Sequence, residues 1–418
     1  MRFRYPVTFT IAAWLFGFAM LPTSAQNVPA STEHWIGTWA SSQQVPEPAN
    51  ALPVDQLRDA TLRQIVHLSV GGSELRLHLS NAFGTAPLHI DSVHLARPLS
   101  PASDEIDATT DKALTFAGSS DVIIPAGAEY ISDPVEYPVA ALSNLAITFY
   151  LSEPPAQQTG HPGSRATSYV VHGNLVSAAT LPNATKVDHW YQIAGVDVTG
   201  PADAVSIVAL GDSITDGHAT TTNGNDRWTD VLAERLQRAA ATNHIGVLNQ
   251  GIGGNHLLTD GLGPNALARF DRDVLAQTGV RYVIVFEGVN DLGGLTRRCE
   301  VPNAEHEALV AHILAAYQQM ILRAHAHGIE VIGATITPYA GSDYYHPTAR
   351  GEQDRNAVNA WIRAPEHFDA VIDFDKVMRD PSHPDHLQPG YDSGDHLHPS
   401  PVGYRAMANA IPLSLFHP

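Results

Sequence analysis

Serine, histidine and aspartate occur in this chain in a pattern suited to nucleophilic catalysis. Ser213 lies in the run GDSIT at 211–215, and Asp395 precedes His398 by three residues near the C-terminus. A serine hydroxyl is a weak nucleophile at neutral pH, so it needs a base, and histidine is the side chain whose ordinary pKa suits that task. A carboxylate on the other ring nitrogen orients the imidazole and stabilises its cation. We therefore predict Ser213 as nucleophile, His398 as base and Asp395 as the orienting carboxylate.

Two further runs could supply hydrogen-bond donors to a tetrahedral oxyanion. Gly254 lies in NQGIGGN at 249–255, and Asn290 lies in GVND at 288–291. Backbone amides and a side-chain amide are suitable donors, and glycine leaves the backbone open to approach. We expect the oxyanion hole to comprise the backbone N–H of Ser213, the backbone N–H of Gly254 and the side chain of Asn290.

Each of these residues also has a purely structural interpretation. Ser213 or Asp395 could cap a helix, Gly254 could be a turn glycine, and Asn290 could belong to a turn or a cap. His396 competes with His398 as the base, but two residues apart they would point in opposite directions in an extended loop.

Histidines near the C-terminus raise the alternative of a metallohydrolase. However, neither an HExxH run nor paired cysteines at zinc-binding spacing occur in the sequence. We expect no metal and no nucleotide cofactor, because glycine-rich phosphate-binding runs are absent as well. The histidines and aspartates of this stretch are His383, Asp385, His386, Asp395, His396 and His398.

The candidate residues follow the strands of a repeating strand–helix pattern after residue 200. Continuous apolar runs predict strands at 205–210, 245–249, 281–287, 330–336 and 370–374. The intervening segments predict helices from Trp228 past Leu236, and at 266–277, 304–327, 352–363 and 403–411. Strands buried on both faces and alternating with helices imply a three-layer α/β fold with a parallel sheet. Ligand sites in such sheets lie at the carboxyl ends of the strands, where these residues fall.

Before residue 200 the pattern is instead one of short alternating strands and turns. In Leu75-Arg-Leu-His-Leu79 the leucines occupy every second position, which places them on one face of a strand. Several such strands without a convincing helix predict a β-sandwich, jelly-roll-like, domain. We therefore divide the chain into a signal peptide at 1–25, the β-sandwich domain at 26–200 and the α/β domain at 201–418. The strands expected in the β-domain are 62–70, 74–79, 88–95, 121–124, 145–151 and 168–171.

The first 25 residues have the features of a secretory signal peptide. Arg2 and Arg4 precede an apolar run at 11–21, and small residues at 23–25 offer a cleavage site. The alternative is an uncleaved anchor, but a span needs about 20 apolar residues. We expect a secreted or periplasmic protein without a stable membrane anchor. Its single cysteine, Cys299, excludes an intramolecular disulfide.

The overall charge disfavours nucleic acid as a partner. With 43 acidic against 24 basic residues, the 418-residue chain carries a formal charge of -19. Binding to a polyanion requires clustered cations that displace its counterions, and no basic cluster is evident in the sequence.

Together, the four runs resemble the SGNH or GDSL hydrolases, a family named for Ser, Gly, Asn and His in four ordered blocks. They match at Ser213, Gly254, Asn290 and Asp395 to His398, although the first block reads GDSIT where the family name has GDSL. The resemblance covers the chain from about Val205 onward. It implies a flavodoxin-like parallel sheet, the SGNH hydrolase fold, without a metal and with an acyl-enzyme mechanism. The β-domain also looks like one found on secreted members of the family.

From this resemblance we expect a secreted serine esterase acting on short-chain acyl esters, with O-acetylated polysaccharide as the leading substrate. The alternatives are a lipolytic or aryl esterase and, more distantly, a carbohydrate-binding protein without catalytic activity. The loop after the fourth strand carries Tyr339, Tyr344 and Tyr345, which could stack on a sugar or aryl ring or simply pack the loop. The oligomeric state does not follow from the sequence.

Overall fold

The structure is a computed structural model that describes residues 34–417, which form one compact unit. The predicted signal peptide at 1–25 lies outside the described residues. Within 34–417, none of the helices is both long and apolar enough to cross a bilayer. The antiparallel strands end at Gly200 and the parallel strands begin at Val205, but the division into separate domains near residue 200 stays a prediction.

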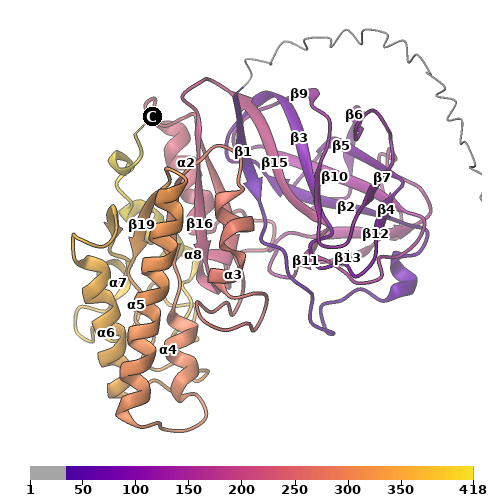
Figure 1. Ribbon diagram of the computed structural model, residues 1–418. Coiled ribbons are helices and arrows are strands. Elements are labelled where there is room, and N and C mark those ends of the chain that lie inside the picture. The colour runs from indigo at the N-terminus through magenta and orange to yellow at the C-terminus, as the bar shows by residue number, and fades with distance from the viewer. Residues whose placement is uncertain (1–33, 418) are drawn as a thin grey trace, which may run out of the picture. The chain divides into compact units, whose positions relative to one another are not determined.

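Residues 34–200, here called the β-part, contain two main antiparallel sheets packed face to face (Figure 1). One sheet has the order β1-β15-β3-β8, with β9 also paired to β3, and the other has the order β13-β12-β2-β10-β5-β6. The predicted β-sandwich is therefore confirmed. The strands are β1 (His34–Ala40), β2 (Ala60–His67), β3 (Gly72–Ser80), β4 (Leu88–Ile90), β5 (Ser92–Pro98), β6 (Ile106–Ala113), β7 (Val122–Ile124), β8 (Glu129–Ile131), β9 (Val135–Val139), β10 (Asn144–Leu151), β11 (Gly160–His161), β12 (Ser168–His172), β13 (Thr185–Val187), β14 (Trp190–Tyr191) and β15 (Ile193–Gly200), with a short 3-10 turn, η1 (Val54–Leu57).

The core of the sandwich follows from the two-residue period of its strands. Leu75, Leu77 and Leu79 of β3 are all fully buried, whereas the residues between them are only partly so. They pack against apolar side chains of β2, β5 and β10 from the facing sheet. The alternation in the sequence thus defines which face of β3 points inward.

Residues 205–416, the α/β-part, are built on a five-stranded parallel sheet of order β17-β16-β18-β19-β20. In chain order this is 2-1-3-4-5, the flavodoxin-like arrangement, so the predicted fold class is confirmed. Strands β16 and β18 extend from its switch point, where ligand sites form in such sheets. The strands are β16 (Val205–Gly211), β17 (Ile245–Gly251), β18 (Val280–Phe286), β19 (Glu330–Ala334) and β20 (Ala370–Ile372).

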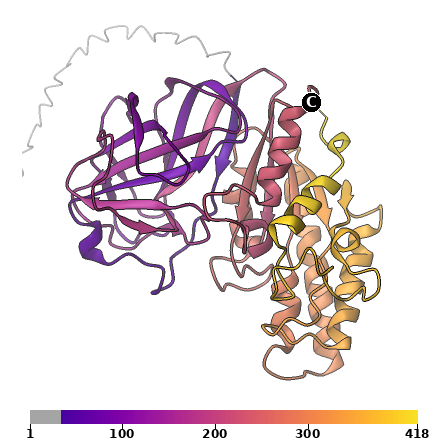
Figure 2. The ribbon, with the colours of Figure 1, turned by 180° about the vertical axis from the view of Figure 1, so that it is seen from behind.

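Helices cover both faces of this sheet. Val208 and Leu210 of β16 join the apolar core beneath α3, α5 and α6, which Figure 1 shows in front of the sheet. Ile207 and Ala209 join the core beneath α2, α7 and α8, and the view from behind in Figure 2 has α2 and α8 in front. Alternate residues of one strand therefore serve two cores, which explains its uninterrupted apolar run. The helices are α1 (Ser213–Asp216), α2 (Trp228–Arg238), α3 (Ala266–Phe270), the π-turn η2 (Asp271–Leu275), α4 (Val289–Thr296), α5 (Asn303–Ala326), α6 (Ala349–Arg363), α7 (Phe374–Met378), α8 (Pro401–Ala410) and the 3-10 turn η3 (Leu413–Leu415).

Most differences from the predicted elements are local. The strand expected at 88–95 is interrupted at Asp91, and the helix expected at 266–277 changes from an α-helical to a π-helical turn at Asp271. The segment 289–296, for which the sequence analysis predicted no helix, forms a helix whose first turn carries Asn290.

Candidate active site

Ser213, His398 and Asp395 form one continuous hydrogen-bonded chain. Ser213 Oγ lies 2.8 Å from His398 Nε2, and His398 Nδ1 lies 2.6 Å from Asp395 Oδ2. The imidazole therefore has one nitrogen on the hydroxyl and the other on the carboxylate. That is the arrangement in which histidine can take a proton from serine while a carboxylate holds its orientation. The structure brings together all three residues predicted as the triad.

Asp395 is held in place by the loop that carries the histidine. Its Oδ1 accepts hydrogen bonds from the backbone N–H groups of Leu397 and His398, at 3.0 and 2.8 Å. Partial burial raises the pKa of Asp395, but the hydrogen bonds from the His398 side chain and backbone, together with the histidine charge, outweigh that effect and hold the pKa well below its ordinary value. Asp395 is therefore an anion at neutral pH.

Ser213 is presented by a tight turn between β16 and α1. Asp212 caps α1 by accepting a hydrogen bond from the N–H of Ile214 at 2.9 Å, which places Ser213 in the first turn. Asp212 is buried, and its burial, together with the nearby carboxylates of Asp291 and Asp216, raises its pKa to about 7 despite the opposing charge of Arg269. Ser213 itself is 8% exposed, so its hydroxyl lies at the floor of the site.

The turn that carries Gly254 offers a backbone donor. Gly254 has φ +70°, a left-handed conformation that favours glycine, and a Cβ there would lie 2.9 Å from a methyl group of Leu262. Within residues 34–417, no acceptor is recorded for the backbone N–H of Ser213 or of Gly254. Both amides are thus available to an oxyanion.

Asn290 is oriented by two hydrogen bonds at the start of α4. Its Nδ2 donates to the carbonyl oxygen of Asn255 at 2.6 Å, and its Oδ1 accepts a hydrogen bond from the hydroxyl of Tyr345. The first bond joins α4 to the Gly254 turn and leaves the second hydrogen on Nδ2 for a ligand. The first bond also fixes which end of the amide is the donor, because a backbone carbonyl oxygen can only accept. Gly253 N–H also bonds to Asp216 of α1 at 3.0 Å. The Gly254 turn therefore links the block of Ser213 to the block of Asn290.

A buried arginine that the sequence analysis did not single out holds these turns together. The guanidinium of Arg269 is fully buried and donates to the carbonyl oxygens of Gly211 and Gln250 at 2.9 and 2.6 Å, and to Asn255 Oδ1 at 2.9 Å. It also pairs with Asp273 at 3.1 Å. One side chain therefore links the ends of β16 and β17 to the Gly254 turn.

Arg269 also reaches Glu287, at the end of β18, but the charge of this carboxyl differs from that of Asp273. The Glu287 contact measures 3.2 Å, yet burial and nearby Asp212 outweigh the arginine and raise the pKa of Glu287 well above its ordinary value. Burial also acts to raise the pKa of Asp273, but Arg272 and Arg269 together lower it. The charge of Arg269 is therefore balanced mainly by Asp273, with Glu287 as a hydrogen-bond acceptor.

The three tyrosines predicted to contact substrate have different surroundings. Tyr339 is 2% exposed and Tyr345 is 3% exposed, because both rings pack into the apolar core of the sheet. Of the two alternatives for this loop, their burial agrees with packing of the loop rather than stacking on substrate, and the Tyr345 hydroxyl contacts Asn290. Tyr344 is 52% exposed, its ring lies edge-on to Tyr345, and the guanidinium of Arg297 lies 3.7 Å from its ring centre.

A second histidine, missed in the sequence analysis, lies against the base. The rings of His218 and His398 are 4.0 Å apart between centroids, and His218 Nε2 lies 4.0 Å from Asp395 Oδ2. Burial, the charge of His398 and the charge of Arg165 lower the pKa of His218 to about 4, so it is neutral at pH 7. Its position five residues after Ser213 was the available signal. Among the described residues, His218, Asp395 and His398 are the one trio whose potential metal-ligating atoms lie within 4.8 Å of one another.

The other histidines of the C-terminal stretch pair separately with aspartates. His396 Nδ1 lies 2.6 Å from Asp392, and His386 Nδ1 lies 2.8 Å from Asp385. His396 has φ +59°, which turns the chain between it and His398, and only His398 reaches Ser213. Of the six residues considered for a C-terminal metal centre, Asp395 and His398 are thus the two that belong to such a trio among the described residues. Cys299, also noted in the sequence, is exposed.

Part of this chain is similar to a known family and to several solved structures. The family model described as GDSL-like lipase/acylhydrolase matches residues 207–411. Similar solved structures include a G-D-S-L family protein from Desulfitobacterium hafniense DCB-2 (27% identity, 49% of this chain and 97% of that chain, TM-score 0.37). Others are the lipase/acylhydrolase from Enterococcus faecalis (25%, 49% and 92%, 0.37) and the aryl esterase of M. smegmatis (19%, 50% and 96%, 0.37). None of the curated proteins matches the sequence.

Replacing Asn290 with alanine should remove one oxyanion donor. We expect a loss of about 3 to 4 kcal/mol of transition-state stabilisation, seen as a fall of about 100- to 1000-fold in kcat on p-nitrophenyl acetate. Tyr345→Phe, which removes only the hydroxyl that orients Asn290, should give a smaller loss in the same direction. A fall of less than threefold for Asn290→Ala would remove Asn290 from the site.

Replacing Asp212 with asparagine should change how stability depends on pH. The folded state holds a proton on Asp212 up to about pH 7, whereas the unfolded chain releases it near the ordinary value of 3.8, so wild-type stability carries a contribution that is lost as pH rises through this window. Asparagine keeps a capping oxygen and has no proton to lose. The free energy of urea unfolding of Asp212→Asn, relative to wild type, should therefore increase from about pH 4 to pH 7. A difference that is constant or decreases over that range would contradict the raised pKa.

Proposed function

Because residues 207–411 are a domain of the GDSL-like lipase/acylhydrolase family, we propose that this protein is a serine esterase that hydrolyses carboxylic esters through an acyl-enzyme on Ser213. Two hydrogen bonds carry this proposal. Ser213 Oγ lies 2.8 Å from His398 Nε2, and His398 Nδ1 lies 2.6 Å from Asp395. The backbone N–H groups of Ser213 and Gly254 have no acceptor within residues 34–417. Nucleophile, base and oxyanion donors thus occur in one site.

The first half of the reaction transfers the acyl group to the protein. Ser213 Oγ attacks the ester carbonyl carbon while its proton passes to His398 Nε2, and the carbonyl electrons move onto the oxygen. The amides of Ser213 and Gly254 and the side chain of Asn290 stabilise that oxyanion. The bond to the alkoxy group then breaks, and the leaving oxygen takes the proton from His398.

The second half returns the acyl group to water. His398 takes a proton from a water molecule as its oxygen attacks the acyl carbon, and then gives that proton to Ser213 Oγ as the acyl-enzyme bond breaks. The products are a carboxylic acid and the regenerated hydroxyl. Throughout, the charged Asp395 stabilises the imidazolium that forms transiently.

For the substrate, we propose a short acyl group, acetyl above all, carried on a carbohydrate. Support comes from Tyr344, an exposed ring in edge contact with Tyr345, which in turn bonds to Asn290. Tyr344 is thus connected through Tyr345 to the oxyanion donor Asn290. An exposed aromatic ring in this position is suited to pack against the apolar face of a sugar. A lipolytic or aryl esterase remains the alternative substrate class, since Tyr344 could equally contact an aryl ring.

We also retain export as part of the proposal, on the sequence features of residues 1–25 alone. The N-terminal residue of the protein recovered from the medium or periplasm of its host tests this proposal, and cleavage after Ala25 is expected.

The direct test compares wild type with Ser213→Ala on p-nitrophenyl esters from acetyl to palmitoyl and on acetylated xylan. Wild type should release acetyl groups fastest, and Ser213→Ala should lose at least about 1000-fold in kcat, because no other group can form the acyl-enzyme. Ser382→Ala, which changes an exposed serine outside the site, is the matched control and should keep wild-type rates.

The same panel separates the alternatives. Preference for long-chain esters would favour the lipolytic alternative, and release from aryl acetates but not from xylan would favour the aryl alternative. Hydrolysis that persists in Ser213→Ala would refute the mechanism. No hydrolysis by wild type together with firm xylan binding would favour the non-catalytic carbohydrate-binding alternative.

A further inference from the structure

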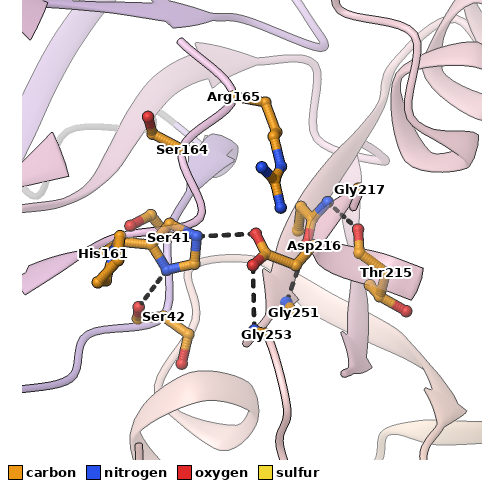
Figure 3. A network of polar contacts seen from close by, with 12 residues as sticks. Ser41, Ser42, His161, Ser164, Arg165, Thr215, Asp216, Gly217, Gly251 and Gly253 are labelled. Carbon is orange, nitrogen blue, oxygen red and sulfur yellow. Dashed lines mark hydrogen bonds and ion pairs between the residues drawn. The ribbon is translucent and has the colours of Figure 1, made fainter. Parts of the chain in front are cut away.

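A histidine from the β-part reaches the helix that carries the nucleophile. His161, in β11, places Nε2 2.9 Å from Oδ1 of Asp216, the last residue of α1 (Figure 3). The side chains of both residues are only 4% exposed. A buried His–Asp hydrogen bond thus links the β-part to the turn of Ser213, three residues before Asp216.

The hydrogen bonds of His161 indicate where the protons of this pair lie. His161 Nδ1 lies 2.9 Å from the carbonyl oxygen of Ser42, which can only accept, so Nδ1 carries a hydrogen. The contact of Nε2 with Asp216 needs a second proton, because a bare ring nitrogen and a carboxylate oxygen repel each other. That proton lies between His161 Nε2 and Asp216 Oδ1, while Asp216 Oδ2 accepts a hydrogen bond from Gly253 N–H. The two side chains are therefore joined by a buried hydrogen bond.

Asp216 transmits this contact to the oxyanion turn. While Oδ1 faces His161, Oδ2 accepts a hydrogen bond from the N–H of Gly253 at 3.0 Å, immediately before Gly254. Figure 3 shows the carboxylate between the imidazole on one side and the glycine turn on the other. The same residue closes α1 through its N–H, which bonds to the carbonyl oxygen of Asp212 at 2.9 Å. Asp216 thus contacts the nucleophile's turn through its backbone N–H and the donor's turn through its carboxylate.

The surrounding chain is shaped for this contact. A Cβ at Gly163 would lie 1.9 Å from Asp216 Oδ2, so only glycine allows the loop after β11 to approach so closely. Trp190 stacks on the ring of His161, with centroids 5.8 Å apart. Arg227 donates through Nε to the backbone oxygen of Asp216 at 2.9 Å and also bonds to the carbonyl oxygen of Ser164. Several independent contacts therefore hold the pair in one geometry.

We propose that His161 is a positioning residue for catalysis: acting through Asp216, it fixes the Gly253–Gly254 turn so that the Gly254 amide points at the oxyanion. The inference rests on the proposed esterase function and adds a role for the β-part, which supplies a side chain that the catalytic machinery of the α/β-part requires. The pair contacts the turn of an oxyanion donor. Losing it should therefore impair the transition state more than substrate binding.

The experiment compares His161→Ala, His161→Gln and His306→Gln in the full chain. Glutamine keeps a donor that can reach Asp216, so it should rescue part of the alanine loss. His306 is the matched control because it forms another buried His–Asp pair, with Asp354 between α5 and α6, and both of those side chains are also 4% exposed. Two quantities are measured: hydrogen–deuterium exchange of peptides spanning 250–256, and kcat and KM on p-nitrophenyl acetate.

We expect His161→Ala to exchange faster at 250–256 and to lose about 10- to 100-fold in kcat, with KM changed by less than about threefold. His161→Gln should fall between His161→Ala and wild type on both measures. His306→Gln should match wild type at 250–256 and in kcat, even if its melting temperature falls. If His161→Ala does not fold, His161→Gln decides by the same two measures.

Unchanged exchange at 250–256 in a folded His161 variant would overturn the proposal, and so would faster exchange with wild-type kcat. A kcat loss of the same size in His306→Gln would also overturn it, because the effect would then be one of general stability. If wild type itself hydrolyses no ester, the esterase function fails. In that case the exchange measurement alone decides whether His161 holds the turn.

Discussion

The buried guanidinium of Arg269 is the interaction on which the geometry of this site depends most. A parallel sheet ends in backbone carbonyls at its switch point, and these groups need donors when turns cover them. Arg269 supplies donors to the carbonyls of Gly211 and Gln250 and to the side chain of Asn255, and Asp273 balances its charge. Because one rigid, planar group contacts all of these positions, the turns after β16 and β17 cannot move independently.

The β-part contributes to the same network from the other side. Ser42, after β1, donates its hydroxyl to Asp273, and its carbonyl oxygen accepts from His161. His161 in turn contacts Asp216, and Asp216 contacts Gly253. The site is thus held between an arginine of the α/β-part and a histidine of the β-part. This continuity supports a role for the sandwich as a structural wall of the site, alongside any part that it has in binding substrate.

The sequence analysis succeeded where chemistry and spacing are local. Ser213 follows a buried strand directly, and Asp395 lies close enough to His398 in the chain for a single loop to join them, so the triad could be predicted without a structure. The parallel sheet followed from alternating apolar runs and helices, and its flavodoxin-like arrangement followed from the family resemblance; both agree with the observed sheet. The alternation of leucines in β3 likewise identified a sandwich face.

The analysis failed where a contact joins distant residues or where burial decides a side chain's role. The loop that carries Tyr339 and Tyr345 has the composition of a binding loop, but both rings pack in the apolar core of the sheet. Residues 289–296 contain glycines and an Asn-Asp pair typical of turns, yet packing makes them helical. For His161 and Arg269, the contacts that matter to the site join residues far apart in the chain, with Asp216 for the histidine and with Gly211 for the arginine.

The central claim is that Ser213 carries the acyl group during turnover. Mass spectrometry of wild-type protein, acid-quenched during hydrolysis of an acetyl ester and then digested, tests this directly. The account predicts a single acetyl group on the peptide containing Ser213, lost again when the substrate is exhausted. Hydrolysis that continues with no acetyl group on that peptide, or with the group on another residue, would contradict it.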